Sequence, residues 1–378
     1  SKTNYDLSKA WWLFKLIGNN RLVKWSKPLS SVAIAIGGPF KFTIKETIYE
    51  HFCGGETIRE CESTIEKLGK YHVYTILDYS VEGKESEEDF ERTANEIMAT
   101  QERAALDDLV PFNVFKLTGL ARFALLEKVS AGKPLTEAET HEFARVKERV
   151  ERLCRKAAEI DRCLMMDAEE SWIQPVMDDL MLEMMRKYNR EKALIFNTFQ
   201  MYRHDRLQVL KNLVELAGNE GFQVGVKIVR GAYMEKERER AREQGYPSPI
   251  QADKASCDRD YNLALETVVE NINRMALVAG THNETSSHYL AELMSQNRLE
   301  PGDKRIYFSQ LLGMSDHISF NLAHAGFNVV KYVPFGPVKD VLPYLIRRAE
   351  ENTSVAGQTG RELNLLSKER ARRKASRR

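Results

Sequence analysis

The sequence has few cysteines and lacks a motif for a bound metal. Its 378 residues include five cysteines, and no two of them form a Cys-x-x-Cys pair. An odd number of widely spaced cysteines argues against a disulfide framework and is typical of a reducing compartment. No His-Glu-x-x-His motif is present, and the eight histidines are not grouped with cysteines or acids at ligand spacing. We therefore expect no metal site.

The chain also lacks a long apolar run and an excess of either charge. The longest apolar candidate, residues 32–36, is far shorter than the ~20 residues with which a helix crosses a bilayer. The 56 lysines and arginines balance 55 aspartates and glutamates, so no general positive field would hold a nucleic acid. With 43% apolar and 29% charged residues, the composition is that of a soluble globular protein. We expect no nucleic-acid partner.

The two ends of the chain differ in composition from the rest. Residues 11–25 mix tryptophans with lysines and arginine, as interfacial helices do, although such a segment can also pack on its own domain. Residues 368–378 are basic and lack apolar periodicity, which is typical of a disordered, solvated tail. Attachment of these ends to the surface of a membrane is the alternative interpretation.

From about residue 70, eight short apolar runs alternate with longer helix-patterned stretches. The runs are rich in β-branched or aromatic residues and are followed by polar residues, which predicts repeated strand–helix units. No Gly-x-Gly-x-x-Gly opens any of the helices, and this weighs against a doubly wound sheet. Eight units predict a distorted (βα)8 barrel of the TIM type. The predicted strands are residues 72–77, 113–117, 162–166, 193–198, 223–229, 275–279, 305–309 and 328–333.

The eight units leave three further segments to be placed. Residues 1–70 have helical patterns and form a predicted N-terminal arm, and residues 356–378 form the basic tail. The barrel spans residues 71–355. Its second strand–helix connection is unusually long, with charged helical patterns at about residues 121–160, and this predicts a helical insertion.

Polar residues recur where the predicted strands end. In a TIM barrel the catalytic groups sit at the C-terminal ends of the strands and in the loops that follow them. Recurrence over eight strands is stronger support for a site than any single residue. The residues concerned are Asp78, Lys116, Asp167, Glu169, Gln200, Tyr202, Lys227, Arg230, Thr281, His282, Asn283, Gln310 and Tyr332.

A paired-arginine motif follows the last predicted strand. Tyr344, Arg347, Arg348 and Glu351 are spaced at i, i+3, i+4 and i+7, so that a helix would carry them on one face. Two planar guanidinium groups suit the carboxylate of a small acid. An exposed helix with surface ion pairs is the alternative interpretation.

Four segments together, residues 227–233, 280–283, 310–316 and 344–352, resemble the proline dehydrogenase family, as do residues 167–170. The resemblance covers roughly residues 70–355. It is closer to the monofunctional, eukaryotic-style enzymes than to the barrel of bifunctional proline utilization A. It implies FAD-dependent oxidation of L-proline to pyrroline-5-carboxylate, by hydride transfer to flavin N5, as the first step of proline catabolism. The electrons would then pass to a quinone.

The resemblance also implies roles for particular residues around the substrate. Lys116, Arg347 and Arg348 would pair with the proline carboxylate, and Asp167 would be an acidic partner of this cationic cluster. In the family the tyrosine at the position of Tyr332 favours proline over hydroxyproline, because its ring leaves little room for a hydroxyl group at C4 of the substrate. The apolar walls of the substrate site would be Tyr233, Leu311, Tyr332 and Tyr344.

The expected flavin contacts are carried over by motif. Lys227 would stabilise negative charge on the reduced flavin, and Arg230 would meet the pyrophosphate. Related bacterial barrels have arginine and then lysine at these two positions, the reverse of the order here. Lys254 is expected near the adenine end. The remaining contacts would be Gln200, Val229, Gly231, His282, Asn283 and Glu351.

Three other functions remain open at this point. A hydroxyproline dehydrogenase would share the fold, another flavin barrel such as a methylenetetrahydrofolate reductase would lack the paired arginines, and a non-catalytic amino-acid-binding barrel would hold no flavin. The compartment also has two alternatives. A bacterial enzyme would be cytoplasmic, with peripheral contact to the inner membrane, and a eukaryotic one would lie in the mitochondrial matrix or at its inner membrane. The absence of a leader rich in arginine and serine favours the bacterial case.

Overall fold

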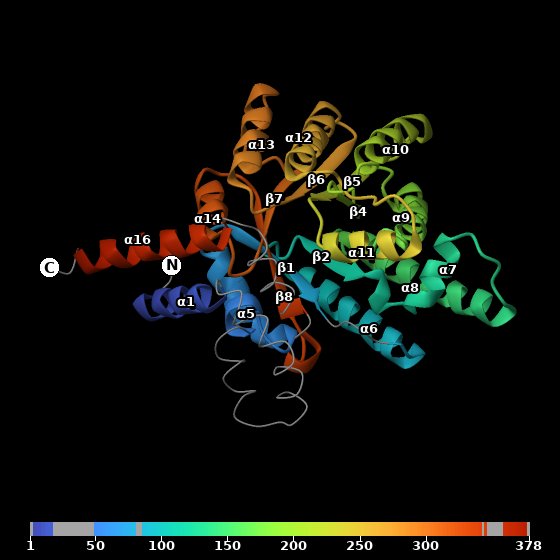
Figure 1. Cartoon of the computed structure of the whole chain (residues 1–378), viewed down its shortest axis with the longest axis horizontal. Helices are drawn as coiled ribbons and strands as arrows, with labels where there is room; N and C mark the ends of the chain where they lie inside the picture. The colour runs from blue at the N-terminus through green and yellow to red at the C-terminus, as the bar shows by residue number, and fades with distance from the viewer. Residues whose placement is uncertain (1–2, 18–48, 81–84, 342–343, 346–357, 376–378) are drawn as a thin grey trace. The chain divides into compact units, whose positions relative to one another are not determined.

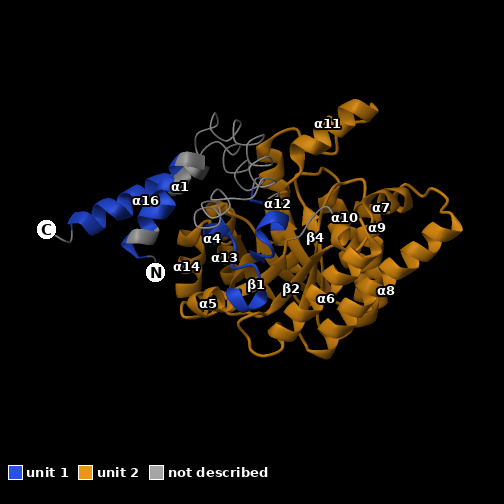
Figure 2. Ribbon diagram, turned by 90° about the horizontal axis from the view of Figure 1, so that it is seen from below, with its two compact units in different colours: residues 1–61, 334–378 blue, residues 62–333 orange. Residues whose placement is uncertain are grey.

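The computed structural model describes residues 3–17, 49–80, 85–341, 344–345 and 358–375. The chain divides into two compact units (Figure 2). One unit combines residues 1–61 with residues 334–378, and the other comprises residues 62–333. Most of the residues that the sequence singled out belong to the second unit.

Eight parallel strands form a closed barrel in which each strand pairs with the next along the chain. The strands lie at the centre of a ring of helices (Figure 1). The predicted (βα)8 fold is therefore confirmed. The strands are β1 (Val73–Tyr79), β2 (Phe112–Lys116), β3 (Cys163–Asp167), β4 (Ile195–Gln200), β5 (Val224–Val229), β6 (Met275–Gly280), β7 (Ile306–Leu311) and β8 (Val329–Phe335).

Short capping motifs define where several of the helices between the strands begin and end. The Ser86 side chain caps α6, Thr136 and Glu139 form a capping box at the start of α8, and Gly221 ends α10 in the left-handed conformation. The short 3₁₀ helix η2 and two α-helices, α7 and α8, separate β2 from β3. The helices are α5 (Ile58–Gly69), α6 (Glu87–Ala104), η2 (Leu117–Gly119), α7 (Phe123–Ser130), α8 (Glu137–Glu159), α9 (Gln174–Tyr188), α10 (Arg206–Glu220), α11 (Met234–Gln244), α12 (Lys254–Glu270), α13 (Glu284–Gln296) and α14 (Asp316–His324).

Alternate residues of the strands fill the barrel interior. Phe112 packs edge-on against Phe196 and Tyr307, with ring centroids 5.5 and 4.8 Å away. Because side chains on a strand alternate between its two faces, the series Phe112, Val114, Lys116 points inward, and Lys116 ends it at the C-terminal edge. Lys116 is in register with Asp167, the last residue of β3. The packed core therefore gives way to charged side chains at the barrel mouth.

The first unit contains α1 (Asn4–Ile17), α4 (Glu50–Phe52) and α16 (Gln358–Ala375). Leu7 and Ala10 of α1 form a small buried cluster with Leu366 of α16, and Trp11 Nε1 donates to Ser367 Oγ at 2.8 Å. The expectation of a disordered tail was therefore wrong as far as Ala375. Apolar residues upstream of the basic run give α16 a face to bury, and the helix continues from there through the basic residues. No helix among the residues described here is long and apolar enough to cross a membrane.

Candidate functional site

Three side chains from three strands meet at the mouth of the barrel. The Lys227 ammonium group donates to Asp167 Oδ1 and to the Tyr332 hydroxyl group, each at 2.6 Å. The Tyr332 hydroxyl group in turn donates to Asp167 Oδ1 at 3.1 Å. All three side chains are largely buried. We refer to Asp167, Lys227 and Tyr332 as the mouth triad.

A second ion pair lies beside the mouth triad. Lys116 Nζ is 3.5 Å from both carboxylate oxygens of Asp78, and Ser80 Oγ donates to the same carboxylate at 2.5 Å. Burial alone would raise the pKa of Asp167, but Lys227 and Lys116 hold it below its ordinary value. Burial lowers the pKa of Lys227, and Asp167 opposes that shift. The mouth therefore holds two lysines and two aspartates, among which Asp167 and Lys227 favour each other's charged form.

Glu169, which follows Asp167 of the mouth triad by two residues, has a buried carboxylate group. Both of its carboxylate oxygens accept from Thr118, one from the backbone amide at 3.1 Å and one from the hydroxyl group. The backbone carbonyl of Glu169 accepts from Gln200 Nε2 at 2.7 Å. Burial raises the pKa of Glu169 to about 7, and the Thr118 hydrogen bonds only partly offset this. Glu169 therefore titrates near neutral pH in the folded protein.

Glu169→Gln is expected to make the stability of the protein less dependent on pH. Because the folded pKa of Glu169 lies above its ordinary value of 4.5, its contribution is fully present below about pH 4.5 and is lost as the pH rises through about 7. Between about pH 5 and pH 8 the wild-type chain should lose roughly 2–3 kcal/mol of unfolding free energy from this group. Urea unfolding of the wild-type protein and of Glu169→Gln at the two pH values measures this change in unfolding free energy. A difference between them that does not change with pH would contradict the assignment.

Arg230 follows β5 and is held by side chains from two helices and a loop. Its Nε donates to Asp258 Oδ1 at 2.6 Å, its Nη1 to Thr281 Oγ1 at 2.7 Å and its Nη2 to Ser286 Oγ at 2.9 Å. The guanidinium group also lies 4.3 Å from the ring centroid of Tyr261. These contacts use three of its five N–H donors. Arg230 is thus a fixed cation with further donors for an anionic group.

The two residues after Thr281 are oriented by their neighbours. His282 Nδ1 lies 2.9 Å from Ser315 Oγ, a contact that joins the loops after β6 and β7. Asn283 caps α13, its side chain accepting from the Ser286 amide at 3.2 Å. His282 and Asn283 are both half-buried. The Asn283 side chain is therefore engaged in its own helix, and the His282 ring is oriented by Ser315.

Gly231 lies directly after Arg230 in a conformation that suits only glycine. Its φ is 137°, and a Cβ atom there would come within 2.5 Å of the Tyr202 ring. The Tyr202 amide donates to the Arg230 carbonyl at 2.6 Å, so the two loops run against each other at this point. The glycine thus allows the β4 and β5 loops to approach closely.

The other predicted site residues have different surroundings. Leu311 is in register with Tyr332 and packs against the barrel interior. Val229 ends β5, and Tyr233 precedes α11 and is half-buried. Lys254 is largely exposed and pairs with Asp258, which also accepts from Arg230.

The predicted carboxylate grip falls largely outside the part of the chain that the structure describes. Arg347, Arg348 and Glu351 belong to the undescribed residues. Tyr344 is described, belongs to the first unit, and is buried. The grip stays a prediction from sequence.

Several residues of the site were not predicted as such from sequence. Asp78 and Glu169 were noted at strand ends, but neither was given a role. Thr118, Asp258 and Ser315 had no signal at all, because short polar residues in loops and helices are common and their partners are distant in the chain. Only the folded chain shows that they orient the predicted residues.

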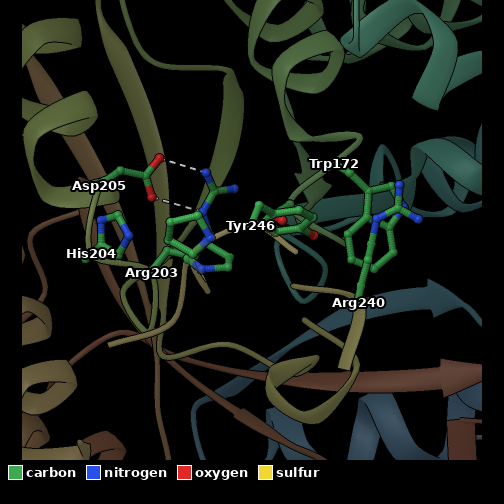
Figure 3. Close-up of a pocket in the computed structure, with 9 residues that line it drawn as sticks. Trp172, Arg203, His204, Asp205, Arg240 and Tyr246 are labelled. Atoms are coloured by element: carbon green, nitrogen blue, oxygen red, sulfur yellow. Dashed lines mark hydrogen bonds and ion pairs between the residues drawn. The ribbon is translucent and has the colours of Figure 1, made fainter. Parts of the chain in front are cut away.

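A cavity of about 460 Å³ is lined by residues such as Trp172, Arg203 and Arg240, and it contains none of the predicted site residues. In Figure 3 the Arg240 guanidinium group lies against Trp172, 4.4 Å from the ring centroid, and Arg203 forms a paired contact with Asp205 at 3.0 and 2.7 Å. Arg240 is also paired with Glu127. Both arginines of the cavity are therefore already paired with carboxylates.

The described residues contain no group of three or more His, Cys, Asp or Glu side chains that could hold a metal ion.

Comparison with protein families gives one match over most of the chain. The family described as Proline dehydrogenase matches residues 61–361. Among curated proteins, the carbapenem antibiotics biosynthesis protein CarD of Pectobacterium carotovorum is 38% identical over 88% of this chain and 85% of its own length. Mitochondrial proline dehydrogenase 1 of Homo sapiens is 45% identical over 63% of this chain, but only 40% of its own length is covered.

Among solved structures, proline utilization A from Bdellovibrio bacteriovorus inactivated by N-propargylglycine is similar in fold. The two structures superpose with a TM-score of 0.73 at 20% sequence identity, over 92% of this chain and 37% of the other. At this identity the similarity supports the architecture of the barrel.

Proposed function

Because the chain belongs to the proline dehydrogenase family, we propose that it oxidises L-proline to pyrroline-5-carboxylate, with FAD as its cofactor and a quinone as the electron acceptor. The observation that carries the proposal is the mouth triad, with the Lys116–Asp78 pair beside it. A buried cluster of lysines and aspartates at the C-terminal end of a (βα)8 barrel is where such enzymes bind a small charged substrate.

Proline carries a carboxylate and an amine, and the mouth of the barrel has groups of both signs. Lys116, together with Arg347 and Arg348, would bind the carboxylate. Asp167 is ionised at neutral pH because Lys227 and Lys116 lower its pKa, so it balances the cations when no substrate is bound. In this proposal Lys227 and Asp167 also fix the hydroxyl group of Tyr332, so that its ring forms a rigid wall for the substrate.

The donors at the ends of β4, β5 and β6 fit FAD. These strands are neighbours in the barrel, and they carry Gln200, Arg230 and His282, whose N–H groups suit the oxygen acceptors of a pyrophosphate and an isoalloxazine ring. FAD when bound would accept the hydride from the ring carbon beside the proline nitrogen. The protein's task is to align the substrate and to exclude water. The remaining proposed contacts are Lys227, Val229, Gly231, Lys254, Asn283 and Glu351.

Tyr332→Ser is expected to shift the substrate preference toward hydroxyproline. The ring is buried and its hydroxyl group is held at two points, so it cannot swing aside for a larger substrate. Opening this space should raise the ratio of kcat/KM for hydroxyproline to that for proline by about tenfold. Tyr332→Phe keeps the ring but loses both hydrogen bonds of the hydroxyl group, so its ratio should lie between those of the wild type and the serine variant. If the serine variant keeps the wild-type ratio, Tyr332 does not select the substrate.

The test of the activity is the visible spectrum of the purified protein with FAD, recorded anaerobically before and after adding L-proline. Bleaching of the flavin band supports the proposal. A flavin band that persists with proline but bleaches with hydroxyproline favours the hydroxyproline enzyme. If no FAD binds, the non-catalytic barrel is the better interpretation.

We also propose that α1 and α16 of the first unit together contact an anionic membrane surface. This contact would bring the enzyme to the quinone that is dissolved in the membrane. Trp12 is 55% exposed, Lys15 lies over both Trp11 and Trp12, and Arg370 lies over Trp11. The last turn of α16 adds three cations. An inner bacterial or mitochondrial membrane would supply the anionic lipid. Vesicles containing phosphatidylserine should co-sediment the protein, and equal sedimentation of Trp12→Ser would count against it.

A further inference from the structure

Lys331 is a fully buried lysine that the proposed reaction does not use. It lies on β8 next to Tyr332, and none of its surface is exposed. Since its two neighbours in the strand, Val330 and Tyr332, belong to the barrel interior, Lys331 points to the opposite face. A buried ammonium group is costly unless oxygens surround it. Its contacts should therefore explain why a lysine lies here.

The Lys331 ammonium group binds the loop that joins β7 to α14. It donates to the Leu311 carbonyl at 3.2 Å, to the Met314 carbonyl and to Asp316 Oδ1 at 3.0 Å. Leu311 is the last residue of β7, Met314 lies within the loop, and Asp316 is the first residue of α14. One cation therefore fixes the whole course of residues 311–316.

This loop has an unfavourable backbone that needs such support. Gly313 has a φ of 76°, and Ser315, which is not a glycine, has a φ of 51°. A non-glycine residue in the left-handed region costs free energy and persists where surrounding contacts hold it. In this conformation Ser315 Oγ lies 2.9 Å from His282 Nδ1. The contacts of Lys331 thus lead to a residue at the proposed FAD site.

We infer that Lys331 is a positioning residue for FAD binding, acting through Ser315 on His282. Its contacts with the loop hold Ser315 where its hydroxyl group occupies Nδ1 of His282. That hydrogen bond fixes the orientation of the His282 ring, which is a proposed FAD contact. The inference rests on the proposed function, because it needs FAD as the ligand.

The experiment is a double-mutant cycle on FAD affinity, measured by quenching of flavin fluorescence on titration into apoprotein. Lys331→Met should weaken FAD binding about tenfold in the wild-type background, because the loop that places Ser315 against His282 loses its charge-assisted hydrogen bonds. In a His282→Ala background the same change should weaken binding less than about threefold. Ser315→Ala should reproduce the loss of FAD affinity while Lys331 stays in place. If Lys331→Met does not fold, the FAD affinity of Ser315→Ala tests the inference alone.

Arg149→Met is the matched control for loss of a buried cation. Arg149 is almost fully buried in α8, binds the Leu120 carbonyl and pairs with Glu91, and has no part in the FAD site. Arg149→Met should lower the melting temperature of the protein and leave its FAD affinity unchanged. Equal losses of affinity for Lys331→Met with and without His282, or an unchanged affinity in Ser315→Ala, would overturn the inference. Failure of the wild-type protein to bind FAD would instead refute the proposed function.

Discussion

Asp167→Ala is expected to lower the free energy of unfolding by about 3–5 kcal/mol and kcat/KM for proline by roughly 100-fold. The change leaves the buried ammonium group of Lys227 without its carboxylate, at the place where Lys116 adds a second positive charge. It also removes an acceptor from the Tyr332 hydroxyl group, so the proposed substrate wall loses its hydrogen bond to Asp167. Urea unfolding at neutral pH and steady-state kinetics measure the two effects.

A double variant distinguishes the effect on stability from the effect on turnover. Asp167→Ala combined with Lys227→Met removes both charges. It should recover most of the lost stability, because the uncompensated cation is gone. It should not recover turnover, since the Tyr332 ring is then held at neither point. Stability that falls further in the double variant would contradict the assignment of Lys227 and Asp167 as a coupled pair.

Gly231→Ala is expected to cost several kcal/mol of stability and to weaken FAD binding. A side chain at a φ of 137° costs about 1–3 kcal/mol, and the added Cβ atom would lie 2.5 Å from the Tyr202 ring, which adds about 1–3 kcal/mol of overpacking. Displacement of Tyr202 would also disturb its hydrogen bond to the Arg230 carbonyl. Chemical denaturation and flavin titration measure both losses.

Gly221→Ala is the control for the backbone term alone. Gly221 has a φ of 73° at the end of α10, and an added Cβ atom would meet nothing within 4 Å. It should cost only about 1 kcal/mol and leave FAD affinity unchanged. Equal losses of stability and FAD affinity in Gly231→Ala and Gly221→Ala would mean that the contact with Tyr202 has no effect.

The barrel could be predicted because its pattern is local. Each strand is a short apolar run between polar residues, and the eight predicted runs overlap the eight observed strands. Lys116, Asp167, Lys227 and Tyr332 could be selected for the same reason, since each stands at or near the end of such a run. Position along one strand is enough to place a residue at the mouth of the barrel.

Which charges pair with each other could not be predicted in this way. Asp167 was expected to be an acidic partner of the substrate-binding cations, and its direct bond is to Lys227, while Lys116 is bonded to Asp78. These choices depend on the register and tilt of strands that are far apart in sequence. Lys331 shows the same limit, because a lysine in an apolar strand does not reveal which loop it binds.

The pairing of α1 with α16 has a consequence for the order of folding. Trp11 and Ser367, which join the two helices, are 356 positions apart in the chain. Closing a loop of that length costs roughly 5 kcal/mol of chain entropy, more than a few helix contacts return, unless the intervening chain has already become compact. The two helices should therefore pair late. The aromatic and cationic surface that they form together would exist only on chains that have completed folding, so an unfolded chain would not present it.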